Sequence, residues 1–300
     1  MANTTAIHAA ITLLATTQSV TTAITAPTFA RALSITGVPA GTSLTGNVTL
    51  TGTDATGEVA IETLALDGSN TVPGRKAFAT VTTIALPVRI TALDTVSVGV
   101  ATTLFSVAEA RTFGRRELAD QNTYSDADIL NAEAEIREAF EQVCGVAFIP
   151  ATTEQYLDGS GTSSLLLSQA KVQAITAGVI YDADMVARET FDATDLADLA
   201  IYGDGRLTRR TKGSWPRGDR NIKLTIVHGY PVCPQEIRRA AIKVAIAKLV
   251  PSDLGDRATY MSDGNMTFSL STAGRFGAEY GLPEVDATLA RYSHKLPGIA

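Results

Sequence analysis

The sequence predicts two structural classes in one chain: an all-β sandwich of immunoglobulin-like type, followed by an α+β domain of helices and β-hairpins. All eight tyrosines and the single tryptophan follow Arg116, whereas residues 1–105 contain neither type and are rich in threonine. From Glu109 onward, charged helical runs alternate with short apolar segments. A chain of 300 residues has room for this division, since domains typically span about 100–200 residues.

Residues 1–105 carry the pattern of short strands. Along 47–52 (NVTLTG) and 58–66 (EVAIETLAL), apolar and polar residues alternate, which places one face of each strand in a core. Several short strands separated by turn residues are typical of a sandwich. The absence of Cys and Trp from this part excludes an antibody-type domain. The expected strands are 32–35, 47–52, 58–66, 77–84 and 94–100, with turns at 37–41, 54–57, 67–70 and 73–74.

The second part begins after a charged linker or short helix at 106–121, and its α+β domain covers 122–250. A first helix begins at Ser125, which forms a capping box with Asp128, and Gly145 ends it. Its glutamates, Glu133 among them, are expected away from the apolar face. A second helix runs from Pro234 to about residue 250 and is apolar on two faces, which is typical of a helix deep in a core or an oligomer.

Short strands are expected between the two helices, and an arm after them. Residues 182–199 are acidic and predict a loop or a short helix. Residues 251–300 are rich in Gly, Ser and Asp and are expected to form a C-terminal arm without a core of its own, apart from a short helix at 283–292. The expected strands are 146–149, 154–157, 163–168, 172–181, 207–209 and 222–227, with a turn at 158–161.

Composition and motifs exclude several classes of protein. The net charge of −6 argues against a dedicated nucleic-acid-binding domain, and no apolar run is long enough to span a bilayer. No Lys or Arg precedes the apolar stretch at the N-terminus, so no signal peptide is expected. The two cysteines and three histidines lie outside any metal-ligand spacing. The phosphate-binding and acyl-transfer motifs are absent as well, so we expect no enzyme and no catalytic, cofactor-binding or metal site.

A basic segment stands out in this acidic chain. Seven basic residues and Asp219 as the one acidic residue lie between positions 206 and 223, around the Trp215–Pro216 pair. Two interpretations stay open: a solvated hairpin, or a contact for phosphate or for an acidic partner surface. Trp215 is expected to anchor the hairpin by packing its ring. The candidate interaction residues are Arg206, Arg209, Arg210, Lys212, Trp215, Arg217, Arg220 and Lys223.

Weaker candidates have simpler explanations. The Arg217–Gly218–Asp219 triplet spells an adhesion motif but also fits a turn between strands. His228 at the end of a predicted strand is expected to fill a turn. Of the acidic pairs, Asp126 with Asp128 suits a helix N-terminus, and Asp182/Asp184 and Asp195/Asp198 suit a solvated loop.

The second part resembles a known family in the order of its segments. A capped acidic helix (YSDADILNAEAEIREAFEQVCGVAFIP) leads to a tyrosine-bearing strand and turn (EQYLDGSG) and an apolar strand pair (SSLLLSQAKVQAITAGVIY). A tryptophan–proline hairpin (GSWPRGDRNIKLTIVHGYPVCP), an alanine-rich helix (QEIRRAAIKVAIAKLV) and a closing GLPEVDATLARY follow. This set resembles the head–tail adaptor (head completion, connector) family of tailed bacteriophages. Residues 1–105 are similar to the immunoglobulin-like modules appended to phage virion proteins.

The resemblance implies a structural virion protein without catalytic residues or cofactors. Such adaptors assemble as a ring, by resemblance of twelve copies, under the portal protein, and join the DNA-filled capsid to the tail. The implied partners are other copies of the chain, the portal protein, the next neck or tail-completion protein, and the genome DNA in the channel. No membrane is implied as a partner. The implied location is the neck of the virion, after assembly in the host cytoplasm. The alternatives are a receptor- or glycan-binding virion protein that uses the β module, and a phage-borne hydrolase.

Overall fold

The structure is a computed structural model, and its described residues fall into two compact units. The described residues are 7–27, 29–41, 43–114, 118, 120, 123–203, 205–250, 260–263, 266–269, 280 and 282–293. Unit 1 comprises Met1–Cys144 and Cys233–Ser293, and unit 2 comprises Gly145–Val232 together with His294–Ala300, which lies outside the described residues. Within the described chain, unit 2 is thus inserted between two segments of unit 1.

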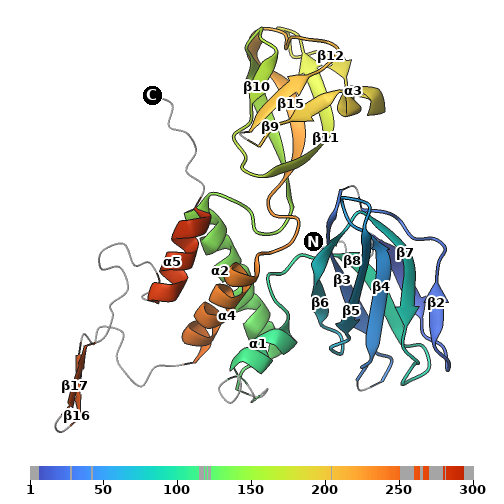
Figure 1. Cartoon of the computed structure of the whole chain (residues 1–300), viewed down its shortest axis with the longest axis vertical. Coiled ribbons are helices and arrows are strands. Elements are labelled where there is room, and N and C mark those ends of the chain that lie inside the picture. The colour runs from blue at the N-terminus through green and yellow to red at the C-terminus, as the bar shows by residue number, and fades with distance from the viewer. Residues whose placement is uncertain are drawn as a thin grey trace. The chain divides into compact units, whose positions relative to one another are not determined.

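A β-sandwich forms the first part of unit 1. Two four-stranded antiparallel sheets, ordered β1-β8-β3-β6 and β2-β7-β4-β5, enclose one core (Figure 1). The alternation expected along 58–66 is confirmed in β5, where every second side chain is buried. The strands are β1 (His8–Thr12), β2 (Gln18–Val20), β3 (Arg31–Val38), β4 (Asn47–Thr53), β5 (Val59–Ala65), β6 (Thr71–Phe78), β7 (Thr80–Leu86) and β8 (Thr95–Val100).

Three of the expectations for the sandwich were wrong. The run 77–84 is not one strand, because β6 ends and β7 begins within it, and β1 and β2 were not expected. The Pro73–Gly74 turn is instead the middle of β6. This strand lies at the edge of its sheet, where a proline without an N–H group is tolerated. A Cβ at position 74 would lie 2.6 Å from Glu62 Oε2, so this close approach favours glycine.

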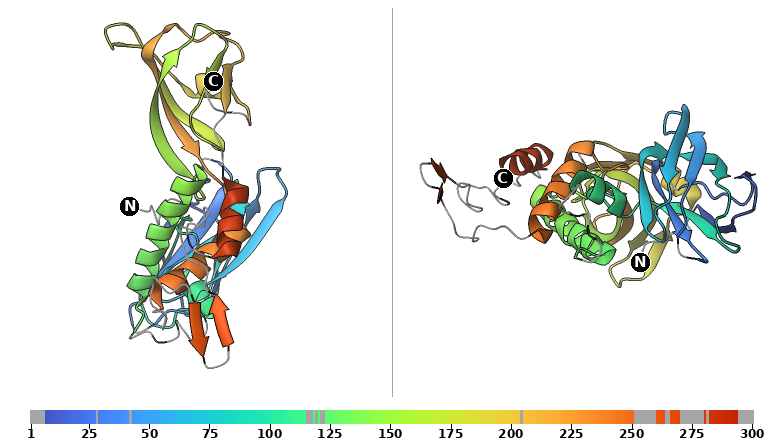
Figure 2. Two further views of the ribbon diagram at one scale, coloured as in Figure 1. Left: turned by 90° about the vertical axis from the view of Figure 1, so that its left-hand side faces the viewer. Right: turned by 90° about the horizontal axis from the view of Figure 1, so that it is seen from below.

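Unit 1 also contains four helices. They are α1 (Val107–Gly114), α2 (Asp126–Cys144), α4 (Gln235–Leu249) and α5 (Pro283–Tyr292). Helices α2, α4 and α5 lie side by side (Figures 1 and 2). The capping box of α2 is confirmed, because Ser125 and Asp128 each accept the other's backbone N–H, at 3.2 and 3.0 Å. Gly145, with φ +65°, ends this helix as expected.

Helix α4 hides one apolar face inside unit 1. It contacts α1, α2 and α5, and Ile237, Ala241 and Ala245 are fully buried. On its second face Ile242 is buried, whereas Ile246 and Leu249 are half-buried, so packing within the subunit explains part of the two-faced pattern. Glu133 on α2 was expected away from the buried face but is only 2% exposed. Its carboxylate accepts the N–H of Leu104 at 2.8 Å, and desolvation raises its pKa.

The C-terminal helix contributes to this core, which revises one expectation. Helix α5 occupies the predicted residues 283–292, and its Val285 and Leu289 are almost fully buried. We expected an arm without a core of its own, but loss of α5 would uncover apolar surface on α2 and α4. The strands β16 (Tyr260–Asp263) and β17 (Met266–Ser269) form a two-stranded ribbon, and the rest of the expected arm lies outside the described residues.

Unit 2 consists of two small antiparallel sheets and a short helix. One sheet has the order β12-β11-β15-β9 and the other β10-β14-β13. The predicted strands 172–181 and 222–227 correspond to β11 and to part of β15. The elements are β9 (Ala151–Gly159), β10 (Ser164–Leu166), β11 (Val172–Tyr181), β12 (Ala187–Thr190), α3 (Ala193–Ala197), β13 (Leu199–Ile201), β14 (Arg206–Arg209) and β15 (Gly218–His228).

Two predicted segments of unit 2 differ from the structure. Residues 146–149 are buried but form no strand. They pack as a loop, in which Phe148 stacks on Tyr230 with ring centroids 5.8 Å apart. Residues 182–199 contain α3, the short helix that was one of the two predictions, together with a strand, β12, that was not expected. Asp192 and Asp195 cap this helix and Glu189 pairs with cations, whereas Asp182 and Asp184 are exposed at a turn.

Candidate functional site in unit 2

The basic segment predicted as an interaction site is divided between the core and the surface of unit 2. Trp215 is fully buried and packs near Phe191, with ring centroids 6.3 Å apart. Its backbone N–H donates to Thr162 O at 2.8 Å, which fixes the segment between β14 and β15. Trp215 therefore anchors the segment from inside and offers no contact surface.

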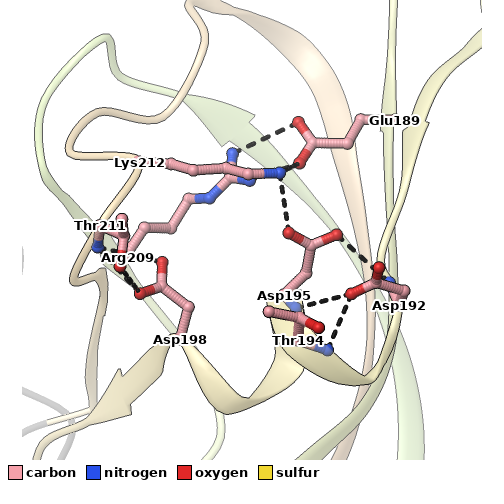
Figure 3. A network of polar contacts seen from close by, with 8 residues as sticks. All are labelled: Glu189, Asp192, Thr194, Asp195, Asp198, Arg209, Thr211 and Lys212. Atoms are coloured by element: carbon pink, nitrogen blue, oxygen red, sulfur yellow. Dashed lines mark hydrogen bonds and ion pairs between the residues drawn. The ribbon is translucent and has the colours of Figure 1, made fainter.

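Arg209 and Lys212 form an internal ion-pair network (Figure 3). The Arg209 guanidinium is 5% exposed and binds both carboxylate oxygens of Glu189. Lys212 Nζ lies 2.6 Å from Glu189 Oε1 and 2.7 Å from Asp195 Oδ1. Two of the seven basic side chains are thus neutralised by residues of β12 and α3.

Helix α3 positions the acidic side of this network. Asp192 caps the helix by accepting the N–H groups of Thr194 and Asp195, both at 2.8 Å. The Asp195 carboxylate accepts the N–H of Asp192 at 3.3 Å, which completes a capping box. Asp198 at the end of α3 accepts the N–H and the hydroxyl of Thr211. Asp192 and Asp195 have the spacing of a capping box, and this was the sequence signal that could have indicated the helix.

The pairing shifts the pKa of each of these groups in the direction that favours its charged form. Hydrogen bonds from Arg209 and Lys212 lower the pKa of Glu189 against the opposing effect of desolvation. Hydrogen bonding to Lys212 lowers the pKa of Asp195, and hydrogen bonding to Thr211 lowers that of Asp198. The pKa of Lys212 is raised by Asp195 and Glu189. All these groups are therefore charged at neutral pH, as an ion-pair network requires.

The remaining basic residues lie at the surface, several against aromatic rings. Arg206 stacks over the Tyr202 ring at 4.5 Å from its centroid. Arg220 and Lys223 lie over Tyr156 at 5.3 and 5.8 Å, and Lys223 also pairs with Glu154 at 2.9 Å. Such cation–aromatic pairs are suited to contacts with a protein partner or with anionic groups.

Arg210 and Arg217 are the simplest candidates for external contact. Both are exposed, and neither has a side-chain ion pair with a described residue. The exposed part of the candidate site thus comprises Arg206, Arg210, Arg217 and Arg220. Arg209, Lys212 and Trp215 serve the fold of unit 2 instead.

Other candidate residues have structural roles. His228 is 8% exposed, its Nε2 lies 2.9 Å from Thr153 Oγ1, and desolvation lowers its pKa. Among the described residues, no group of His, Cys, Asp and Glu is placed to hold a metal ion. In the same part of the chain, every helix is too short or too polar to span a bilayer.

Solved structures similar to this chain include chains of gene transfer agent (GTA) particles. No protein-family model matches the chain, and no curated protein matches it. The chain is similar to one from the neck of an empty GTA particle computed with C6 symmetry, with 18% identity over 65% of this chain and 92% of that chain, and a TM-score of 0.40. It is also similar to a chain from the virion of a native gene transfer agent (GTA) particle, with 17% identity over 58% and 81% of the two chains and a TM-score of 0.37.

Proposed function

We propose that this chain is a structural virion protein, a head–tail adaptor that forms a ring under the portal and joins the DNA-filled capsid to the tail. The observation that carries the proposal is the ordered set of segments after residue 122. The structure has the capped helix α2, the strands β9 and β11, the Trp215 segment and the helix α4 in this order, and the sequence of these segments resembles the adaptor family.

The proposed role has no chemical step and needs no cofactor. By the resemblance, twelve copies surround a channel for the genome, with the portal protein on one side and the next neck or tail-completion protein on the other. We propose residues 1–105 as an immunoglobulin-like module and residues 122–250 as the adaptor domain. Residues 106–121, proposed as a linker, include helix α1, and residues 251–300, proposed as a C-terminal extension, include helix α5; both helices pack against α4. The protein would be assembled in the host cytoplasm and reside in the neck of the virion.

The exposed arginines suit a protein partner better than DNA. Duplex DNA carries one negative charge per roughly 1.7 Å of its axis, so a continuous ring of arginines would bind the genome and slow its exit. We therefore propose that Arg206, Arg210, Arg217 and Arg220 contact an acidic surface of the portal or tail. Sparse contact with DNA is the second use that we propose for them.

Native mass spectrometry of the purified full chain, with negative-stain imaging, tests the ring. We expect a closed oligomer with a central opening at micromolar concentration. A compact monomer at every concentration would contradict the adaptor proposal and favour a receptor-binding protein or a hydrolase.

An apolar surface at one end of the sandwich favours a second candidate function, receptor binding by the β module. Asp94 is fully buried and accepts the N–H groups of Ala40, Ile90 and Thr91, at 2.9, 3.0 and 2.6 Å. These bonds hold the loop after β7 in a fixed shape. Exposed apolar surface of this kind marks protein-binding sites more often than glycan sites. The exposed side chains are Leu14, Val38, Val88, Ile90 and Leu93.

Replacement of Leu93 by asparagine tests this second candidate. Leu93 is 74% exposed and has φ +74°, a conformation that asparagine adopts more readily than leucine. We expect Leu93→Asn to keep the fold and to lower adsorption of particles to host cells. Val59→Thr, at an exposed position of β5, is the matched control. Unchanged adsorption of the Leu93 variant would argue against a receptor-binding module.

A further inference from the structure

A cationic groove runs across unit 1. It has a volume of about 930 Å³ and lies among α1, α4 and the strands β5 and β6. Its apolar lining includes Phe113, which is 44% exposed, and Ile242. The basic side chains that line it are Arg75, Arg238, Arg239 and Lys243, and the acidic ones are Glu62 and Glu109.

The cations of the groove are incompletely neutralised. Arg75 and Arg238 share the single carboxylate of Glu109. Arg238 is 2% exposed, its terminal nitrogens lie 3.4 Å from Glu109 Oε1 and 3.5 Å from Gly74 O, and its buried Nε has no partner among the described residues. Arg239 is exposed, and no described residue forms an ion pair with it. A ligand of this groove should therefore bring negative charge.

The tip of the β11–β12 hairpin in unit 2 has the complementary character. We define the hairpin tip as residues 182–186 (DADMV). Met185 and Val186 are 54% and 60% exposed, and they follow two exposed aspartates. The Asp182 carboxylate accepts the N–H groups of Asp184 and Val186, at 3.0 and 2.9 Å, which gives the tip a fixed shape.

Backbone conformation at the tip indicates that the methionine side chain is used. Met185 has φ +58°, a conformation that costs a residue with a Cβ roughly 1–2 kcal/mol and that glycine adopts without cost. A large apolar side chain retained in a strained and exposed position is typical of a contact residue rather than of a turn chosen for stability.

We propose that the hairpin tip of one copy docks in the cationic groove of a second copy. The tip supplies two negative charges to a groove in which Arg239 has no ion pair with a described residue. Of the other basic side chains, Lys243 pairs with Glu284, and Arg75 and Arg238 share Glu109. Asp184 faces the unpaired Arg239, and Met185 packs against Phe113 and Ile242. Because tip and groove are different surfaces, each copy offers one of each, and such a contact closes a ring when its rotation permits. The inference rests on the proposed ring and names a contact that holds it.

Charge exchange between the two surfaces tests the contact in the full chain. Asp184→Arg and Arg239→Asp should each raise the dissociation constant for self-association roughly tenfold or more, measured by sedimentation velocity, because each places like charges together. The double variant Asp184→Arg/Arg239→Asp should restore association, since it recreates an opposite pair. Asp219→Arg, at an exposed position outside both surfaces, is the matched control.

The variant Met185→Gly distinguishes loss of the tip–groove contact from loss of folding. The variant relieves the backbone strain, so its melting temperature should be unchanged or higher while its self-association weakens. A wild-type chain that stays monomeric would overturn the ring and this contact with it. A wild-type chain that assembles, with charge variants that assemble equally well, would overturn the tip–groove contact alone and leave the groove to another protein.

Discussion

Replacing Trp215 with alanine is expected to lower the free energy of unfolding of unit 2 by about 3–5 kcal/mol. Its indole is the largest fully buried side chain and lies in the core formed by both small sheets. Arg209 lies over the same ring, at 5.5 Å from its centroid. Alanine would leave a cavity and would remove one wall of the site where the Arg209 ion pair forms.

Hydrogen exchange measured by mass spectrometry checks this expectation unit by unit. Peptides from β11, β14 and β15 should lose protection in Trp215→Ala, whereas those from the sandwich should not. Trp215→Phe is the matched control: the indole Nε1 is buried without an acceptor among the described residues, so phenylalanine loses no hydrogen bond. Unchanged protection in the alanine variant would mean that the segment holds its place without this side chain.

Local signals in the sequence predicted those elements whose boundaries depend on nearby residues. Ser125, Asp128 and Gly145 fixed the ends of α2, since capping is a contact between residues three or four positions apart. The chain combines a β-sandwich with helices, as alternation and turn residues predicted. Residues 71–78 were misassigned because the tolerance for Pro73 depends on an edge position, which is a property of the whole sheet.

The candidate site could be predicted only as a stretch of sequence. Clustering of basic residues along the chain does not say which carboxylates face them: Asp195 and Asp198 were expected in a solvated loop, and Glu189 was not singled out. Antiparallel pairing of β11 with β12, and the turn of α3, bring these three residues to the basic segment. The groove in unit 1 was missed for the same reason, because its residues come from segments more than 100 positions apart in the sequence.

Reversing the charge of Arg209 should separate the structural arginine from the contact arginines. Arg209→Glu removes the partner of Glu189 from a site that is 5% exposed and adds a carboxylate near Asp195 and Lys212. Placing a carboxylate without a cationic partner at this buried position, next to Glu189, is expected to cost about 3–5 kcal/mol, because the new charge is buried beside a like charge. The expected result is a destabilised unit 2, and any loss of tail attachment in this variant follows from misfolding.

The double variant Arg210→Glu/Arg217→Glu is expected to keep the stability of unit 2 and to lose tail attachment. Both side chains are exposed, so the free energy of unfolding should change by less than about 0.5 kcal/mol, while attachment of tails to filled heads falls. Trp215 is the only tryptophan and lies in unit 2, so its fluorescence during urea unfolding reports the stability of that unit in both variants. Normal yields of tailed, infectious particles from the Arg210/Arg217 variant would show that these arginines are a solvated face. Equal stability of Arg209→Glu and the wild type would show that the buried pair does not support the fold.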